Sequence, residues 1–244
     1  MNRNRKTIVV FGVLFALMLA NAEINSVQAA EPAKVAKPLL VKYVPPMRGA
    51  PASRVGGGSR GVGDDAPQLS VLAPDHTGLT IQEQPTLYWY VSKPVVAHLE
   101  VTVINDQLVD PLVDKDFAVP TKAGIQRLRL ADFGVKLKPN VEYRWYVSLI
   151  VDSAQRSNDI IASGTIQRIL PSQELKEKLA HADKKSQTGI YAEAGIWYDA
   201  VSSISELIMA KPEEQALREQ RAELLEQVGL DEAADSDRHM GAMK

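Results

Sequence analysis

The chain of 244 residues contains no cysteine, and histidine is scarce. Without cysteine, disulfides and a lipoprotein anchor are both excluded. The four histidines, His76, His98, His181 and His239, are far apart in the sequence. Metal sites usually take two or three histidines at short, defined spacing. The sequence therefore predicts neither a metal site nor a cofactor.

Long apolar runs are also scarce, and one stands out near the N-terminus. Ile8 to Ala20 is apolar, follows a basic stretch that begins at Arg3, and precedes the small-residue cleavage pattern Val27-Gln28-Ala29. A spanning helix needs about 20 residues, so an uncleaved membrane anchor is the weaker alternative. We interpret residues 1–29 as a cleaved secretory signal peptide. This predicts a periplasmic or secreted protein, with no stable membrane insertion after cleavage.

A concentrated basic surface is lacking as well. Lys+Arg and Asp+Glu nearly balance, at 28 and 30, but their distribution is uneven. Residues 31–68 carry six cations and three anions, whereas residues 171–244 carry nine cations and fifteen anions. Nucleic-acid binders concentrate lysine and arginine on one face, so the sequence predicts no nucleic-acid partner.

Residues 30–68 are rich in proline and glycine. Such a segment buries too little apolar surface to offset the entropy of ordering it, so we expect an extended basic arm. Within it, Leu39 to Val44 form a short apolar patch that is suited to docking on another surface. Gly57 to Gly61 match the letters G-x-S-x-G, but a nucleophile elbow needs a strand before and a helix after the serine. Neither element is predicted there.

From Leu69 the pattern changes to short strands separated by turn residues. Within residues 141–152, Tyr143, Trp145, Val147 and Leu149 alternate with more polar residues, which predicts a strand with one buried face. Trp89, on another strand, is expected to face them across the core. The expected strands are 69–73, 79–82, 86–91, 97–104, 117–119, 125–130, 141–152 and 160–169.

The spacing of Leu137-x-Pro139 to Tyr143 resembles a tyrosine corner. In that motif a tyrosine packs inward at the start of a strand while its hydroxyl bonds to the backbone just upstream. Together with eight short strands, this predicts a mainly β fold over residues 69–170. The expected architecture is a fibronectin type III or immunoglobulin-like β-sandwich.

Residues 171–230 have a helical pattern, with helices expected over 172–186, 190–210 and 212–228. Part of this segment resembles one tetratricopeptide repeat, a helix pair that cannot bury its own face alone. We therefore expect it to pack on the sandwich, with a small interaction tail as the alternative. Residues 231–244 are expected to be a disordered tail. The positions that match the repeat are Tyr191, Gly195, Ala200, Ile204 and Pro212.

Four phrases in the sequence resemble one bacterial family, the domain of unknown function numbered 928. They lie at 54–61, 78–91, 142–152 and 195–200, and their order and spacing match from about Arg54 to Leu230. The resemblance implies an exported bacterial protein with no established activity. Members often carry a cysteine after the glycine-rich phrase, where this chain has Val62-Gly63-Asp64.

Two loops carry clustered polar residues. Asp106, Asp110, Asp114 and Asp116 contain the oxygen ligands that calcium prefers, but their spacing matches no standard calcium loop. We interpret them as a solvated acidic loop. The second loop joins the last two strands. Its residues either form turn hydrogen bonds or present a binding patch at one end of the sandwich; they are Asp152, Arg156, Asn158 and Asp159.

No set of residues in the sequence forms a coherent catalytic constellation. We therefore expect a non-catalytic interaction or scaffolding protein of the bacterial envelope, with a protein partner. One alternative is an enzyme that uses acid and base groups in the loop from Asp152 to Asp159. The other is a carbohydrate-binding module with Tyr88, Tyr90 and Tyr146 on an open sheet face.

Overall fold

The computed structural model describes residues 41–46, 66–105, 110–117, 122–150 and 154–242. The predicted signal peptide, most of the predicted arm with Gly57 to Gly61, and Asp106 and Asp152 lie outside these ranges. In the part of the chain that the structure describes, no helix has the length and apolar character needed to span a bilayer.

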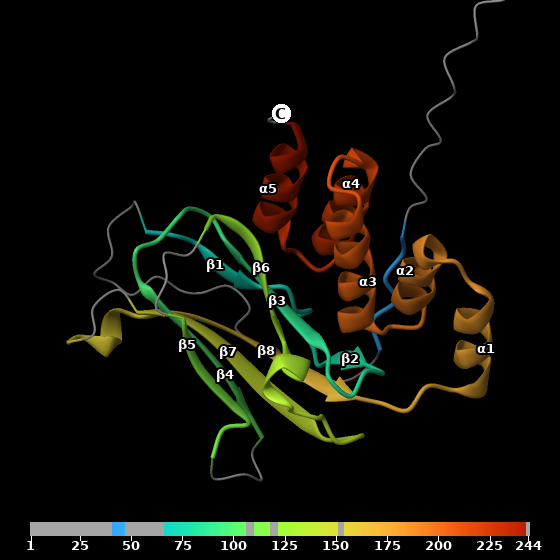
Figure 1. The fold of residues 1–244 in the computed structure, drawn as a ribbon, viewed down its shortest axis with the longest axis horizontal. Coiled ribbons are helices and arrows are strands. Elements are labelled where there is room, and N and C mark those ends of the chain that lie inside the picture. The colour runs from blue at the N-terminus through green and yellow to red at the C-terminus, as the bar shows by residue number, and fades with distance from the viewer. Residues whose placement is uncertain (1–40, 47–65, 106–109, 118–121, 151–153, 243–244) are drawn as a thin grey trace, which may run out of the picture. The chain divides into compact units, whose positions relative to one another are not determined.

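The N-terminal half forms two β-sheets (Figure 1). One has three strands in the order β1-β3-β6, and the other has five in the order β2-β8-β7-β4-β5. All pairings are antiparallel except that of β2 with β8. The strands are β1 (Leu69–Val71), β2 (Gly78–Thr80), β3 (Thr86–Val91), β4 (His98–Ile104), β5 (Val113–Phe117), β6 (Gly124–Arg129), β7 (Glu142–Ile150) and β8 (Ile160–Arg168).

The core lies between the two sheets and is built by alternation along the strands. Tyr143, Trp145, Val147 and Leu149 of β7 are all buried, which confirms the predicted inward face. Trp89 of β3 is buried in the same hydrophobic cluster. Burial of aromatic side chains of this size removes about 150–250 Å² each from water, so these residues contribute much of the core's stability.

Strand β5 was wrongly placed by the sequence pattern. Asp114 and Asp116, which we interpreted as part of an acidic loop, lie on an edge strand paired with β4, and their side chains are exposed. His98 of β4 lies 3.2 Å from Asp116 across this pair. Charged side chains on an edge strand oppose pairing with another sheet. Their polarity therefore reflects the position of the strand at the edge.

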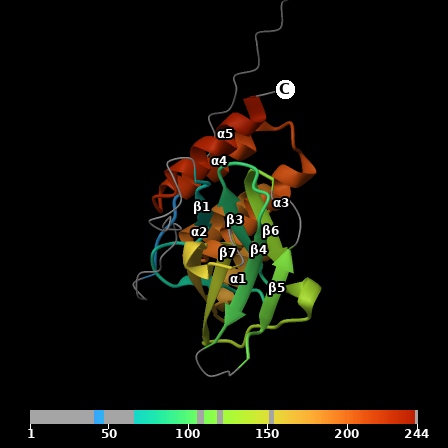
Figure 2. The same cartoon turned by 90° about the vertical axis from the view of Figure 1, so that its left-hand side faces the viewer.

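Five helices follow the sheets (Figures 1 and 2): α1 (Gln173–His181), α2 (Lys184–Glu193), α3 (Trp197–Ala210), α4 (Gln215–Glu226) and α5 (Asp231–Ala242). The predicted helix over 172–186 is interrupted, because the Asp183 side chain caps a new helix by accepting a hydrogen bond from the Ser186 N–H at 2.7 Å. At the start of α1, Ser172 accepts from the Leu175 N–H in the same way.

The predicted disordered tail is wrong for the residues that form α5. Ala233, Ala234 and Asp237 are buried, and α5 packs along α4. The buried face of α5 consists of two alanines and Asp237, whose carboxylate forms a buried ion pair with Arg221. It therefore lacks the large apolar side chains that mark an amphipathic helix in a sequence.

The helices form two hairpins, α2 with α3 and α4 with α5. Gly195 and Gly229 each end the first helix of a hairpin in the left-handed conformation, with φ of 73° and 71°. Glycine adopts this conformation without steric cost. The two glycines are 34 residues apart. The sequence pattern indicated one such helix pair, and the structure contains two.

Helix α3 attaches the helical segment to the sandwich. The indole N–H of Trp197 donates to the carbonyl oxygen of Leu72 at 2.9 Å. The Tyr198 hydroxyl accepts from the Trp145 indole N–H at 2.8 Å and donates to the Thr165 carbonyl at 2.9 Å. Both α3 side chains are buried. The first turn of α3 is therefore part of the sandwich core.

An extended segment, Val41–Pro46, packs against both parts of the fold. The Tyr43 N–H donates to the Gln227 side-chain oxygen at 2.8 Å, and the Gln227 amide donates to the Val41 carbonyl at 2.7 Å. The Tyr43 ring contacts Trp197 edge to face, and its hydroxyl lies 2.9 Å from a ring nitrogen of His76. Residues 41–44 of the apolar patch predicted in the arm are thus docked within their own chain.

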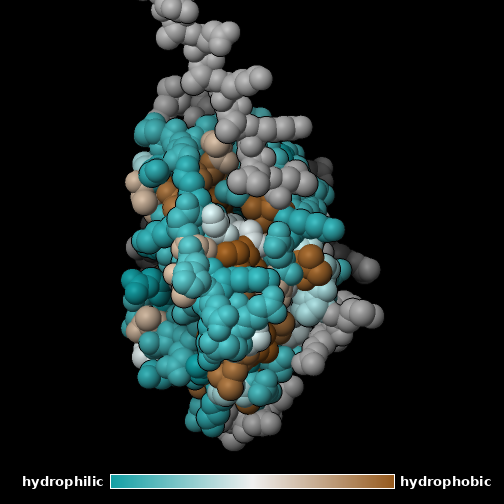
Figure 3. Space-filling view, turned by 90° about the vertical axis from the view of Figure 1, so that its right-hand side faces the viewer, coloured by the Kyte–Doolittle hydropathy of each residue, from teal (hydrophilic) through white to brown (hydrophobic). Residues whose placement is uncertain are grey.

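The face formed by α1 and α2 is mostly hydrophilic, with separate apolar patches (Figure 3). Beneath it lies a small satellite core made by Leu79, Leu175 and Ile196. On the other side of the helical segment, α3 and α5 cover the outer face of the three-stranded sheet. The three-stranded sheet therefore has the helices on one face and the five-stranded sheet on the other (Figures 1 and 2).

Candidate functional site

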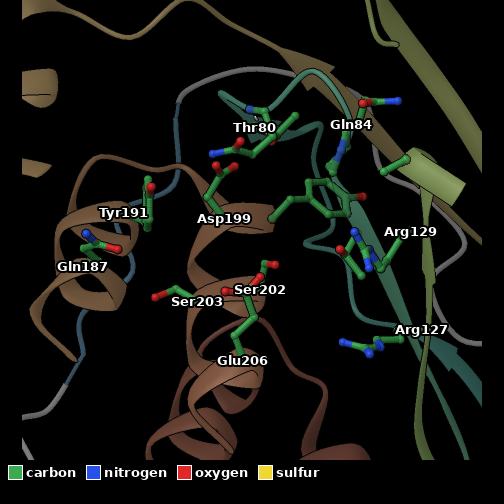
Figure 4. A pocket seen from close by; sticks show the side chains of 15 residues that line it. Thr80, Gln84, Arg127, Arg129, Gln187, Tyr191, Asp199, Ser202, Ser203 and Glu206 are labelled. Carbon is green, nitrogen blue, oxygen red and sulfur yellow. Dashed lines mark hydrogen bonds between the residues drawn. The ribbon is translucent and has the colours of Figure 1, made fainter. Parts of the chain in front are cut away.

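A polar cleft of about 450 Å³ lies where the three-stranded sheet meets the first helical hairpin (Figure 4). This volume is in the range of small-molecule sites, roughly 300–1,000 Å³. The cleft is bounded by the β2–β3 connection, β6, α2 and α3. Its lining is Thr80, Gln82, Gln84, Pro85, Thr86, Arg127, Arg129, Ala131, Gln187, Tyr191, Tyr198, Asp199, Ser202, Ser203 and Glu206.

Secondary-structure periodicity places these side chains on facing walls. Arg127 and Arg129 are two residues apart on β6, so both point to the helix-covered face of the sheet. Asp199, Ser202 and Glu206 follow one another at helical spacing along α3. Figure 4 shows the arginines on one wall, Tyr191 on the opposite wall, and the α3 side chains between them.

The cleft contains charges of both signs that are open to a ligand. Arg129 has a long ion pair with Asp132, at 3.9 Å, in which both side chains are more than half exposed. Such surface pairs contribute little, about 0–1 kcal/mol. Neither Arg127 nor Glu206 has an ion pair with any other residue in the described ranges. An incoming ligand can therefore pair with these charges without first breaking a strong internal contact.

Asp199 lies at the inner end of the cleft, in the first turn of α3. Its side chain is buried, at 4% exposure for the residue. One carboxylate oxygen accepts from the Ile81 N–H at 3.2 Å, and the other has no hydrogen-bond partner among the residues described. Burial raises the pKa of Asp199 to about 6, although the polar groups of Thr80, Gln82 and the Ile81 backbone near the carboxylate act in the opposite direction.

The raised pKa of Asp199 makes stability depend on pH in a defined direction. Because the folded protein binds this proton more tightly than the unfolded chain does, the stabilisation is complete below the unfolded pKa of 3.8 and is lost as pH rises through about 6. We expect wild type to lose about 1–3 kcal/mol between pH 4 and pH 7.5 relative to Asp199→Asn. Urea unfolding of both proteins at the two pH values measures this difference.

The exposed Asp114→Asn on β5 is the matched control for this measurement, and it is expected to follow wild type at both pH values. Parallel pH profiles for wild type and Asp199→Asn would show that the buried carboxyl does not titrate in this range.

The predicted loop residues are found in the 3-10 helix η2 (Arg156–Asn158) and beside it. Arg156 donates to both carboxylate oxygens of Glu100, at 3.1 and 2.8 Å, and to Asp159 at 2.6 Å. These hydrogen bonds raise the pKa of Arg156. The Asn158 amide donates to the Gln155 side chain at 3.3 Å. The structure brings Arg156 and Asp159 together in contacts that shape the loop, and Asp152 lies outside the described residues.

The predicted tyrosine face is wrong in its geometry. Tyr88 and Tyr90 of β3 are buried, at 4% and 3% exposure, beneath the helices. Tyr146 is half-buried on β7 of the other sheet. Alternation along β3 separates its two faces correctly, but it does not reveal that α3 and α5 cover the outer one. Over the described ranges, no three histidine, aspartate or glutamate side chains are grouped closely enough to hold a metal ion.

The residues of the cleft were not identified from the sequence. Arg127 and Arg129 alternate with apolar residues in β6, a pattern that is typical of an ordinary solvent-facing strand. Asp199 follows two aromatic residues and has the appearance of a helix-start carboxylate. Only the Gly195–Ala200 phrase, which also carries the family resemblance, was a signal at this position. Trp197 within that phrase is completely buried in the core.

Comparison with curated proteins finds no match. Among solved structures, an engineered protein from a structural genomics programme matches at 14% identity and a TM-score of 0.28, over 43% of this chain and 20% of its own. This chain thus spans about a fifth of that protein. A multi-domain immunophilin from Arabidopsis thaliana matches at 9% identity and a TM-score of 0.19, over 82% of this chain and 100% of its own. TM-scores this low support no inference about fold or function.

The comparison with family models covers most of the folded region. The model described as Domain of Unknown Function (DUF928) matches residues 55–238, which include all eight strands and most of the helical segment. The match extends over well over half of the chain, and the chain therefore belongs to the DUF928 family.

Proposed function

We propose that this protein is an exported, non-catalytic interaction protein of the bacterial envelope, and that it binds its partner in the polar cleft between the sandwich and the first helical hairpin. The observation that carries the proposal is the presence of Arg127 and Glu206 in that cleft, without an ion pair to other described residues. The basic, apolar and small-residue pattern of residues 1–29 supports export.

We further infer that the sandwich is fibronectin type III or immunoglobulin-like. The Tyr143 hydroxyl accepts from the Lys138 N–H at 3.0 Å, which is the hydrogen bond of a tyrosine corner. The sheet orders β1-β3-β6 and β8-β7-β4-β5 correspond to strands A-B-E and G-F-C-C′ of such sandwiches. Domains of this kind commonly bind partners, and this supports an interaction role.

The helical segment is proposed to be two tetratricopeptide-like repeats. The hairpin glycines Gly195 and Gly229 have the 34-residue spacing of that repeat. Ala200 and Ala234 stand at equivalent positions in the second helices, and both are fully buried. Stacked hairpins of this kind present extended binding surfaces. The cleft lies beside the first of them, which supports recognition of a protein segment.

The lining of the cleft specifies the chemistry of the partner. An acidic side chain of the partner would pair with Arg127 and Arg129, and a basic one with Glu206. Amide and hydroxyl groups along the walls would bond its backbone. A protein segment with charges of both signs therefore fits the cleft better than a strongly acidic or strongly basic one.

This proposal can be tested by capture of the partner from an envelope extract on immobilised mature protein, residues 30–244. We expect the double charge reversal Arg129→Glu with Glu206→Arg to abolish capture of a partner that wild type retains. The matched control is Lys176→Glu with Glu177→Arg on the exposed surface of α1, which should capture as wild type does. Arg156→Ala tests the loop that we predicted from the sequence. Equal capture by wild type and the cleft variant would refute the proposal.

A second candidate function is favoured by Asp199 alone. A carboxyl whose pKa is raised to about 6 in a cleft suits a general acid or base. In this enzyme hypothesis the acid or base group is Asp199 of α3, whereas the alternative drawn from the sequence used the loop from Asp152 to Asp159. Incubation of envelope extract with wild type and with Asp199→Asn, followed by mass spectrometry, tests it. A compound consumed by wild type and not by the variant would replace the binding role with catalysis.

A further inference from the structure

A second cavity, of about 390 Å³, lies between the three-stranded sheet and helices α3, α4 and α5. We refer to it as the arginine–methionine groove. Unlike the polar cleft, it has a cationic end and an apolar wall. The residues on which the argument depends are Tyr88, Ile125, Arg127, Met209, Arg218 and Met240.

The cationic end has more positive than negative charge. Arg221 donates twice to Asp237, at 2.7 Å each, and Arg218 donates to the same carboxylate at 3.2 Å. All three side chains are largely buried. Two arginines therefore share one carboxylate, and Arg127 adds a third cation. The groove lining contains these three arginines and no carboxylate, so its potential favours an anion.

Two buried polar groups at this end lack partners within the described residues. The Tyr88 hydroxyl and the Arg218 Nε–H are fully buried and form no hydrogen bond with described residues. Buried polar atoms are bonded in the large majority of cases, so each exception calls for an explanation. Tyr88 is directly opposite Arg127 in the pairing of β3 with β6, so both side chains project from the same sheet face. Both groups can donate to an anionic oxygen.

The apolar wall includes two exposed methionine side chains. Met209 and Met240 are 47% and 41% exposed, and Ile125 and Ile208 lie beside them in the lining. Methionine adapts its shape to bound apolar groups and is frequent on surfaces that accept varied ligands. An aliphatic chain would cover this wall and remove it from water.

We propose that the arginine–methionine groove binds one free, single-chain anionic amphiphile, of the fatty-acid class. Its carboxylate accepts from Arg127, Arg218 and Tyr88, and its chain packs along Met209 and Met240. A cavity of this volume has room for one aliphatic chain of a small ligand, whereas a membrane surface needs an exposed, extended face. The site is separate from the polar cleft, although Arg127 lines both cavities.

Isothermal titration of the mature protein with dodecanoate below its micellar concentration tests the proposal. We expect saturable binding at one site, and no such binding of butyrate, which lacks the chain, or of dodecyl maltoside, which lacks the anionic head. Charge-assisted hydrogen bonds contribute about 1.5–3 kcal/mol, so Arg218→Gln should weaken binding about 10- to 100-fold. Tyr88→Phe should weaken binding about 5- to 10-fold.

Matched variants distinguish binding of dodecanoate in the groove from binding elsewhere on the protein surface. Met209→Glu places a negative charge on the apolar wall and should weaken binding at least about tenfold. Leu170→Glu makes the same kind of change at an exposed apolar residue outside the groove, and Arg129→Gln removes an arginine that lines only the polar cleft. Both should bind within about twofold of wild type. Tyr88→Phe removes only a hydroxyl that has no partner among described residues, so it remains informative if Arg218→Gln unfolds.

Equal affinity for dodecanoate and dodecyl maltoside would overturn the proposal, as would binding that is insensitive to Tyr88→Phe and Met209→Glu. Sedimentation with anionic vesicles, without binding of free dodecanoate, would assign the groove to a membrane surface and also refute it. Arg129 and Glu206 do not line this groove. A negative result with dodecanoate therefore does not refute the proposed function of the polar cleft, which the capture experiment tests separately.

Discussion

Replacement of Asp237 by alanine is expected to lower the free energy of unfolding by about 3–5 kcal/mol, the usual cost of removing one partner from a buried ion pair. Asp237 is fully buried, and its carboxylate binds Arg221 and Arg218. The change leaves two arginines in the interior without their anion. Urea denaturation followed by circular dichroism measures the loss.

Two further variants determine whether the loss comes from the uncompensated charge. The double change Arg221→Met with Asp237→Leu removes the anion together with its closer cation and leaves only Arg218 without its partner, so it should destabilise less than Asp237→Ala, which leaves both arginines unpaired. Glu174→Ala removes the acid of an exposed ion pair on α1 with Lys178, and it should cost less than about 1 kcal/mol. Equal losses for Asp237→Ala and Glu174→Ala would show that the α4–α5 pair is not a buried ion pair in solution.

Trp197→Ala is expected to destabilise the protein by about 3–5 kcal/mol, the range for removing a large buried aromatic side chain. Trp197 is fully buried, donates to the Leu72 carbonyl, and contacts the Tyr43 ring at a centroid distance of 4.9 Å. Its loss opens a cavity where the strands, α3 and the Val41–Pro46 segment meet. The midpoint of urea unfolding, with the slope held constant, measures the effect.

Trp197→Phe separates packing from hydrogen bonding. It keeps most of the ring but leaves the Leu72 carbonyl without its donor, so it should cost about 1–3 kcal/mol. Met209→Ala, at an exposed position of the same helix, should change stability by no more than about 0.5 kcal/mol. If Trp197→Ala unfolded α2–α5 alone, in a transition separate from that of the sheets, then the first turn of α3 would not be part of a shared core.

The local sequence pattern was sufficient to predict an element and its buried face where that face packs directly into the hydrophobic core. The alternation of Tyr143, Trp145, Val147 and Leu149 predicts β7 and its inward face. All strands except β5 lie within two residues of their expected bounds. The expected helix start at residue 172 agrees with the Ser172 cap, and the expected helix end at residue 228 lies directly before Gly229. In each case the signal is contained within a few neighbouring residues.

The pattern failed where a distant segment decides the environment. β5 was interpreted as an acidic loop because an edge strand has few apolar residues, and α5 was interpreted as a disordered tail because its buried stripe is alanine and Asp237. The carbohydrate-binding alternative placed Tyr88 and Tyr90 on an open face, because nothing in β3 itself indicates that the helices cover it. Arg156 donates to Glu100 and Asp159, of which only Asp159 is near it in the sequence.

By itself, the sequence determined the order of strands before helices, the buried faces of the long strands, and the family, because each of these depends on short-range periodicity or on phrases within the chain. Only the tertiary structure decided where a ligand can bind. The polar cleft and the arginine–methionine groove each combine side chains from β-strands with side chains from helices some 60 to 150 residues away. Which charges are left without a partner in such a cavity depends on how the elements pack, and no local pattern records that.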